Sequence, residues 1–86
     1  MKLYVLVDKN LAWRHRAVQA AHAVAEYMKL NPDTPWYNGT LVLLGFEDIN
    51  QDAELCDAIW REPYWGNKIT AAASLKGDLW KNHKLL

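Results

Sequence analysis

The stretch AVQAAHAVAEY, residues 17–27, predicts one long helix in the first half of the chain. It is so rich in alanine and valine that almost every face of the helix looks buried. No glycine or proline occurs from residue 13 to residue 30. The pattern stops at Asn31-Pro32, where the proline ring disfavours helical geometry in the preceding residue. We therefore predict a helix over residues 13–30.

Apolar runs on both sides of this helix predict strands. KLYVLV (residues 2–7) and TLVLLGF (residues 40–46) are near-continuously apolar, as strands covered on both faces are. KITAAAS (residues 68–74) predicts a third strand. Residues 79–86, LWKNHKLL, form either a weak fourth strand or a frayed tail.

A second helix is predicted over residues 49–62, INQDAELCDAIWRE. Asn50 offers an amino-terminal cap, and Leu55, Ile59 and Trp60 recur at helical spacing. Alternating strands and helices predict an α/β fold in three layers, with a mixed, mostly parallel sheet of about four strands and helices on both faces. Chains of 86 residues bury only about 60% of their unfolded surface, so we expect a single domain, 1–86.

Charge and cysteine content exclude several classes of protein. Ten basic and ten acidic residues cancel, so no overall field attracts the chain to nucleic acid or to an anionic membrane. The single Cys56 has no cysteine partner and apolar neighbours, which is typical of a reduced cytoplasmic protein. The apolar run at residues 3–7 is shorter than a signal-peptide core, and no segment approaches the length of a membrane span.

Polar residues on the long helix form one narrow stripe. His15, Gln19, His22 and Glu26 follow at i, i+4, i+7 and i+11, which places them on one side of the helix. Either this stripe faces water, or Glu26 orients the His22 imidazole in a functional site. A zinc site needs at least three protein ligands, which the spacing does not supply, so we expect no metal. No glycine-rich phosphate loop follows the first strand, and no cofactor is expected.

The start of this helix carries an unusual concentration of positive charge. Arg14, His15 and Arg16 lie where the helix dipole is already positive, an arrangement that favours a bound phosphate or carboxylate. The alternative is that both arginines extend into solvent or pair with nearby acids.

Two loops contain adjacent aromatic residues, Trp36-Tyr37 and Tyr64-Trp65. Exposed rings of this kind stack on unpaired bases. In so small a domain, we expect instead that at least three of these four rings close the ends of the core.

The segment VQAAHAV resembles the Gln-x-x-His-Ala signature of the type II peptidyl-tRNA hydrolases, with Gln19, His22 and Ala23 in the matching positions. The order of elements is also similar, including a tryptophan-containing loop before TLVLL and the acidic segment DAELCDAI. This resemblance implies a mixed four-stranded sheet flanked by helices. It also implies metal-free cleavage of the ester that joins a nascent peptide to the 3' ribose of tRNA.

The resemblance and the residue chemistry together give two sets of candidate site residues. The catalytic candidates are His22, Gln19 and Glu26, and the substrate-binding candidates are Arg14, His15, Arg16, Asn10 and Trp36. The chain departs from the family after residues 68–74, where Ala72, Ala73 and Ser74 precede Leu75 and the expected acid is missing. Two functions stay open: a peptidyl-tRNA hydrolase, or an inactive module that binds RNA or a protein. The expected partner is tRNA or another RNA, and a homodimer is an open alternative to a monomer.

Overall fold

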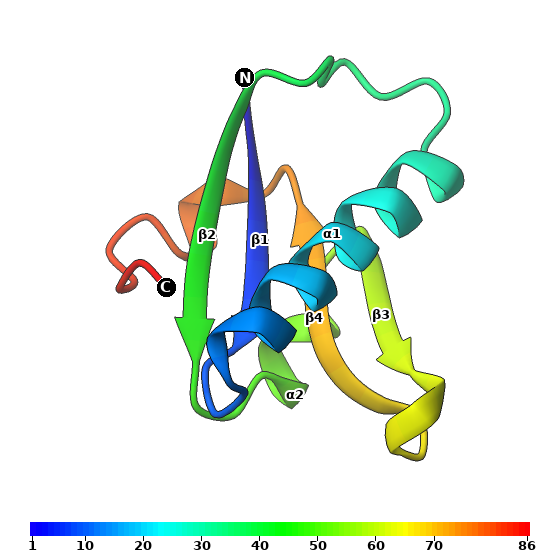
Figure 1. The fold of residues 1–86 in the computed structure, drawn as a ribbon. Helices are drawn as coiled ribbons and strands as arrows, with labels where there is room; N and C mark the ends of the chain where they lie inside the picture. Colours follow the sequence, from blue (N-terminus) through cyan, green and yellow to red (C-terminus); the bar gives the residue numbers. More distant parts are fainter.

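A computed structural model describes all 86 residues and shows a four-stranded mixed sheet crossed by one long helix (Figure 1). The sheet has the strand order β2-β1-β4-β3 and consists of β1 (Lys2–Asp8), β2 (Thr40–Phe46), β3 (Ala58–Glu62) and β4 (Lys68–Ser74). The helical elements are α1 (Trp13–Leu30), the single turn α2 (Asn50–Ala53) and the 3-10 turns η1 (Pro63–Trp65) and η2 (Gly77–Leu79).

Four predicted elements are confirmed. The helix over residues 13–30 is α1, and the apolar runs are β1, β2 and β4. Strands β1 and β2 are parallel along their whole length, from Lys2 opposite Thr40 to Asp8 opposite Phe46. A parallel pair needs a crossover connection, and α1 provides it.

The predicted second helix over residues 49–62 is wrong beyond its first turn. α2 ends at Ala53, and the second half of this segment forms strand β3. β3 pairs antiparallel with β4, whose backbone groups would otherwise be unpaired along that edge. The carboxylate of Asp57 fixes the start of this pairing because it accepts a hydrogen bond from the backbone N–H of Leu75 at 2.9 Å.

The sheet is mixed, as predicted, but β1–β2 is its only parallel pair of neighbouring strands. β1, β2 and β3 run in the same direction, and β4 lies between β1 and β3 and runs antiparallel to both. The connection from β3 to β4 is a short turn, and strands joined in this way must be antiparallel.

The two faces of the sheet are covered differently. α1 packs on one face, where Leu3, Val5 and Val7 of β1 meet Ala23 and Tyr27 of the helix. The second face packs against α2 and against the buried indole of Trp80, so a second helical layer is not confirmed. Of the two alternatives left open for residues 79–86, the strand does not form, apart from one antiparallel bridge between Leu85 and Leu44 of β2.

One end of the sheet brings together the segments that carry Asn10, Arg14, His15 and Arg16. The carboxyl ends of β1 and β2, the start of α1 and the β3–β4 turn all lie at the lower end in Figure 1.

No helix of the structure, including α1, the longest, is both long and apolar enough to cross a membrane.

Candidate functional site

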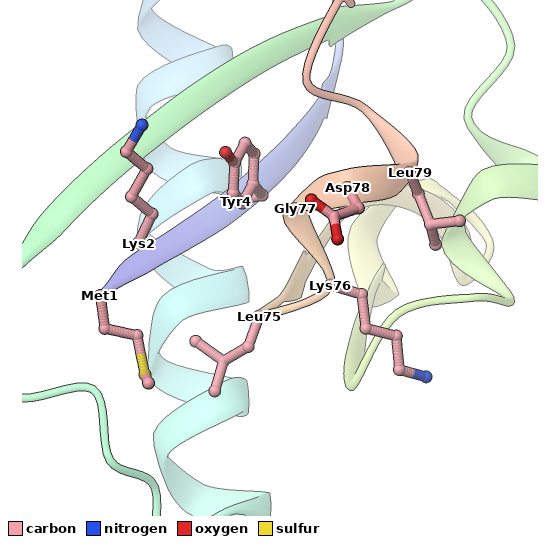
Figure 2. Close-up of a pocket in the computed structure, with 8 residues that line it drawn as sticks. All are labelled: Met1, Lys2, Tyr4, Leu75, Lys76, Gly77, Asp78 and Leu79. Atoms are coloured by element: carbon pink, nitrogen blue, oxygen red, sulfur yellow. The ribbon is translucent and has the colours of Figure 1, made fainter.

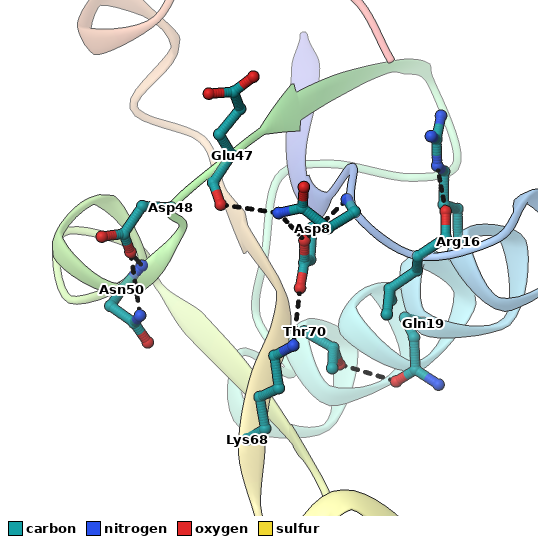
Figure 3. A network of polar contacts seen from close by, with 10 residues as sticks. Asp8, Arg16, Gln19, Glu47, Asp48, Asn50, Lys68 and Thr70 are labelled. Atoms are coloured by element: carbon teal, nitrogen blue, oxygen red, sulfur yellow. Dashed lines mark hydrogen bonds and ion pairs between the residues drawn. The ribbon is translucent and has the colours of Figure 1, made fainter.

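Gln19 lies inside the molecule, between α1 and strands β3 and β4. Its side chain is 2% exposed, so it does not belong to a solvated stripe. The amide Nε2 donates a hydrogen bond to Oε1 of Glu62 at 3.0 Å. The amide oxygen accepts from the indole N–H of Trp60 at 2.9 Å and from the hydroxyl of Thr70 at 2.8 Å, the second of which is drawn in Figure 3. Gln19 therefore joins α1 to both strands of the β3–β4 hairpin.

Glu62, the last residue of β3, places a carboxylate beneath α1. Its residue exposure is 7%, and its second oxygen accepts the backbone N–H of Tyr64 at 3.2 Å. The hydrogen bond from Gln19, and then the one from Tyr64, lower the pKa of Glu62 below its ordinary value, and the nearby His22 acts in the same direction. The site therefore contains an ionised carboxylate at neutral pH.

His22 follows Gln19 by three residues and is exposed on the same side of α1. Its ring stacks on the indole of Trp60, with 4.3 Å between ring centroids and 11° between planes. The indole N–H of Trp60 is in turn held by Gln19. The Gln-x-x-His spacing thus places a buried amide and an exposed imidazole around one tryptophan.

The lowered pKa of Glu62 predicts a pH dependence of stability. The folded protein favours the ionised carboxylate, so its contribution is complete above the ordinary pKa of 4.5 and is lost as the pH falls through the lowered folded-state value. We expect Glu62→Gln to flatten the decline in unfolding free energy between neutral pH and pH values near 3. Urea unfolding across this range measures it. All other acids are the same in the two proteins. If the unfolding free energy of Glu62→Gln falls with pH as steeply as that of the unaltered protein, the lowered pKa does not belong to Glu62.

At the start of α1, the two arginines have different roles. Arg16 donates from Nε to the carbonyl of Leu11 at 2.8 Å and from Nη2 to the carbonyl of Lys9 at 2.6 Å. Its guanidinium also lies 4.9 Å from the ring centroid of Trp13. Arg16 therefore holds the β1–α1 loop against the helix, and this use of its donors does not favour the predicted anion-binding role. Arg14 is exposed and makes no hydrogen bond or ion pair.

His15 is half-buried at the same end of the helix. Its ring meets the ring of Trp65 edge-on, with centroids 5.3 Å apart. This contact brings the start of α1 beside the β3–β4 turn, although the two segments are distant in sequence.

Asn10 stabilises the turn after β1. Its backbone N–H and its Nδ2 both donate to Oδ1 of Asp8, and Nδ2 also donates to the carbonyl of Glu47 at 2.9 Å. The other oxygen of the buried Asp8 lies 3.3 Å from Nζ of Lys68 (Figure 3). These hydrogen bonds give Asn10 a structural role in the turn, and no bound substrate is needed to account for its presence there.

Two predicted site residues lie apart from this network. Glu26 is half-buried and makes no hydrogen bond or ion pair, so the acid nearest the network is Glu62 and not Glu26. Trp36 is 3% exposed, donates its indole N–H to the carbonyl of Thr40 at 3.1 Å, and packs in the core with Tyr27. A buried ring has no free face for a base, which does not favour the predicted stacking role. The other three rings of the two aromatic loops are exposed, so the prediction that at least three of the four close the core is wrong.

The sequence reasoning missed the partners of Gln19 on the hairpin. Trp60 and Glu62 fall in the segment interpreted as a helix, and Thr70 lies inside the alanine-rich strand. Ala58, Ile59 and Trp60 point alternately to the two faces of the sheet, as residues of a strand do. All three are apolar, so the sequence itself shows no alternation that would have revealed the strand.

Other candidate sites lack the same arrangement of groups. An open hollow of about 560 Å³ lies between Tyr4, Lys2 and the η2 turn, and none of the predicted site residues lines it (Figure 2). Burial, followed by the charges of Asp57 and Asp52, raises the pKa of the Cys56 thiol to about 12. This thiol is therefore not an activated nucleophile. No three histidine, cysteine or acidic side chains are grouped closely enough to share a metal ion.

Comparisons with known proteins found no match to this chain among family models, curated proteins or solved structures.

Proposed function

We propose that this protein hydrolyses the ester between a peptide and the 3' ribose of tRNA, the reaction of the type II peptidyl-tRNA hydrolases that its sequence resembles. One observation carries the proposal: the amide Nε2 of Gln19 lies 3.0 Å from Oε1 of Glu62. Gln19 is in α1, about one helical turn before His22. The sequence reasoning placed the third strand at residues 68–74 and found no acid after it. Because the third strand is Ala58–Glu62, the acid at its end is Glu62.

In the proposed reaction, His22 acts as the general base. The imidazole takes a proton from water as the water oxygen attacks the carbonyl carbon of the ester. The imidazolium then returns the proton to the ribose oxygen, which leaves as the 3' hydroxyl of tRNA. Glu62 is a positioning residue, since its negative charge stabilises the positive charge that His22 acquires.

The surrounding side chains hold the base in place before substrate binds. Trp60 supports one face of the imidazole, and Gln19 fixes Trp60 and Glu62 at once. When a catalytic group is already oriented, less conformational entropy is lost on reaching the transition state. The prior orientation of His22, the one exposed histidine of the network, therefore supports a catalytic role for it.

Arg14 is the proposed contact for the negative charge of the substrate. It is exposed and unpaired in the first turn of α1, whereas Arg16 is held by two backbone carbonyls. A guanidinium binds phosphate oxygens well through its planar set of donors. The amino-terminal end of a helix adds a favourable field for an anion.

A second candidate is a binding module on the same fold with no catalytic activity. It is favoured by the hydrogen bonds of Gln19, whose Nε2 and Oε1 both have partners within the protein. In that case the network only stabilises the hairpin, and the end of the sheet binds RNA or a protein without cleaving it.

The two candidates differ in turnover. Purified protein is incubated with tRNA that carries an N-acetylated, radiolabelled amino acid, and the release of acid-soluble label is followed with time. We expect release of more than one equivalent per protein molecule. Binding of the charged tRNA without release would instead establish the binding module.

The proposal also includes the cellular location of the protein and its binding partner. We propose a cytoplasmic location, supported by the free, half-buried Cys56. tRNA is the proposed partner. Whether the protein acts as a monomer or a homodimer is answered by sedimentation with and without tRNA.

A further inference from the structure

The β3–β4 turn presents a tyrosine whose exposure the fold does not explain. Tyr64 is 93% exposed, and its hydroxyl makes no hydrogen bond. A ring in this position adds no packing to either core cluster. Both faces of the ring are therefore open to a ligand.

The turn that carries this ring is fixed on both sides. Pro63 occupies the first position of η1, and the Glu62 carboxylate accepts the backbone N–H of Tyr64 at 3.2 Å. The backbone N–H of Asn67 donates to the carbonyl of Glu62 at 2.9 Å. Gly66 and Asn67 both have positive φ, 65° and 61°, which turns the chain back into β4. The ring is therefore presented by an ordered backbone, which reduces the entropy lost when a ligand binds.

This turn is connected directly to the candidate site. Glu62 accepts hydrogen bonds from Gln19 on one oxygen and from Tyr64 on the other. Trp65, the next residue, contacts His15 of α1. The residue before His15 is Arg14, the unpaired cation in the first turn of α1.

We propose that Tyr64 is the stacking surface for the terminal unpaired base of the tRNA 3' end, with Arg14 contacting a phosphate of the same strand. This inference rests on the proposed function, because it names the part of the substrate that the turn would hold beside His22. The contact between Trp65 and His15 joins the two segments that carry Tyr64 and Arg14. An exposed ring and a guanidinium on such joined segments fit a base and a phosphate of one strand, and stacking does not require a particular base edge. A ring that anchors the substrate equally before and during reaction changes KM and leaves kcat unchanged.

The test uses an uncharged hairpin with the sequence of a tRNA acceptor stem that ends in single-stranded CCA. A second hairpin has an abasic site in place of the last nucleotide. Affinities are measured at low salt by fluorescence anisotropy of a label on the hairpin loop. We expect loss of the terminal base to weaken binding to the unaltered protein about tenfold, the scale of one base stacked on an aromatic ring. Tyr64→Ala should bind both hairpins equally, and Tyr64→Trp should restore the difference.

Tyr37 supplies the matched control, because it is also a highly exposed tyrosine, at 83%, but lies in the loop after α1. Tyr37→Ala should leave both affinities unchanged, and Arg14→Ala should reduce the slope of affinity against salt by about one phosphate contact. The inference is overturned if Tyr64→Ala still distinguishes the hairpins, or if the unaltered protein binds neither. Because the hairpins carry no ester, base-dependent binding through Tyr64 without hydrolysis would sink only the hydrolase proposal. Hydrolysis with an unchanged KM in Tyr64→Ala would sink only the stacking proposal.

Discussion

Replacing His22 with alanine is expected to lower kcat/KM for N-acetylated aminoacyl-tRNA by about 10²–10⁴, the usual contribution of a positioned general base. The loss should fall on kcat, since a group that only transfers a proton contributes little to substrate binding. The fold should be retained, because His22 is exposed and makes no hydrogen bond. Single-turnover release of labelled amino acid measures the chemical step directly, and circular dichroism establishes that the variant is folded.

Lys29→Ala is the control for this change, since it also removes an exposed polar side chain from α1, in its last turn. It should leave the rate within about twofold. Turnover of His22→Ala that stays within threefold of the unaltered protein would remove the imidazole from the mechanism.

Gln19→Leu is expected to lower the free energy of unfolding by about 2–4 kcal/mol. The substitution removes the acceptor for the Thr70 hydroxyl and for the Trp60 indole N–H, and a buried donor without a partner costs about 1–3 kcal/mol. It also removes the donor to Glu62. Leucine fills a similar volume, so the loss reports on the polar contacts and not on a cavity. Urea unfolding at neutral pH measures it.

Gln51→Leu makes the same chemical change at an exposed position of α2. A surface substitution of this kind should stay within about 0.5 kcal/mol. If the two leucine variants have equal stability, the hydrogen bonds around Gln19 do not hold the hairpin to the helix.

The elements that sequence reasoning predicted correctly are those with a strong local pattern. α1 has no internal glycine or proline and ends before Pro32. β1 and β2 are short apolar runs that end at charged residues. The position of β1 follows from the chain itself, because its burial on both faces requires apolar residues at nearly every position. β2 is an edge strand whose first residues are exposed, yet its apolar run has the same length and bounds as the strand.

β3 could not be predicted in the same way. Leu55 and Ile59 lie four residues apart and suggest one face of a helix, yet Leu55 is 50% exposed and Ile59 packs on the second face of the sheet. The strand forms because it pairs with β4, a partner that follows it in the sequence and whose need for hydrogen bonds is not visible locally. Long-range pairing outweighed a weak helical periodicity here.

The candidate site was predicted on the helix and missed on the sheet. Gln19 and His22 stood out as polar residues in an apolar helix, and Glu26 was chosen as the acid because it shares that helix. The carboxylate that contacts Gln19 instead comes from Glu62, which lies 43 residues away in sequence. An interpretation of β3 as a helix separated Glu62 from the site, and with it the tryptophan that supports His22.

The proposed link between His22 and Glu62 is tested most directly by a double-mutant cycle in the hydrolysis of N-acetylated aminoacyl-tRNA. If Glu62 acts through the charge on His22, Glu62→Gln lowers the single-turnover rate about 10- to 100-fold in the unaltered protein, the scale of the effect of one nearby opposite charge. The same change should then lower the rate less than twofold when His22 is already alanine. Losses that multiply in the double variant would contradict a joint action of the two residues, and an unaltered protein that releases no amino acid would contradict the hydrolase itself.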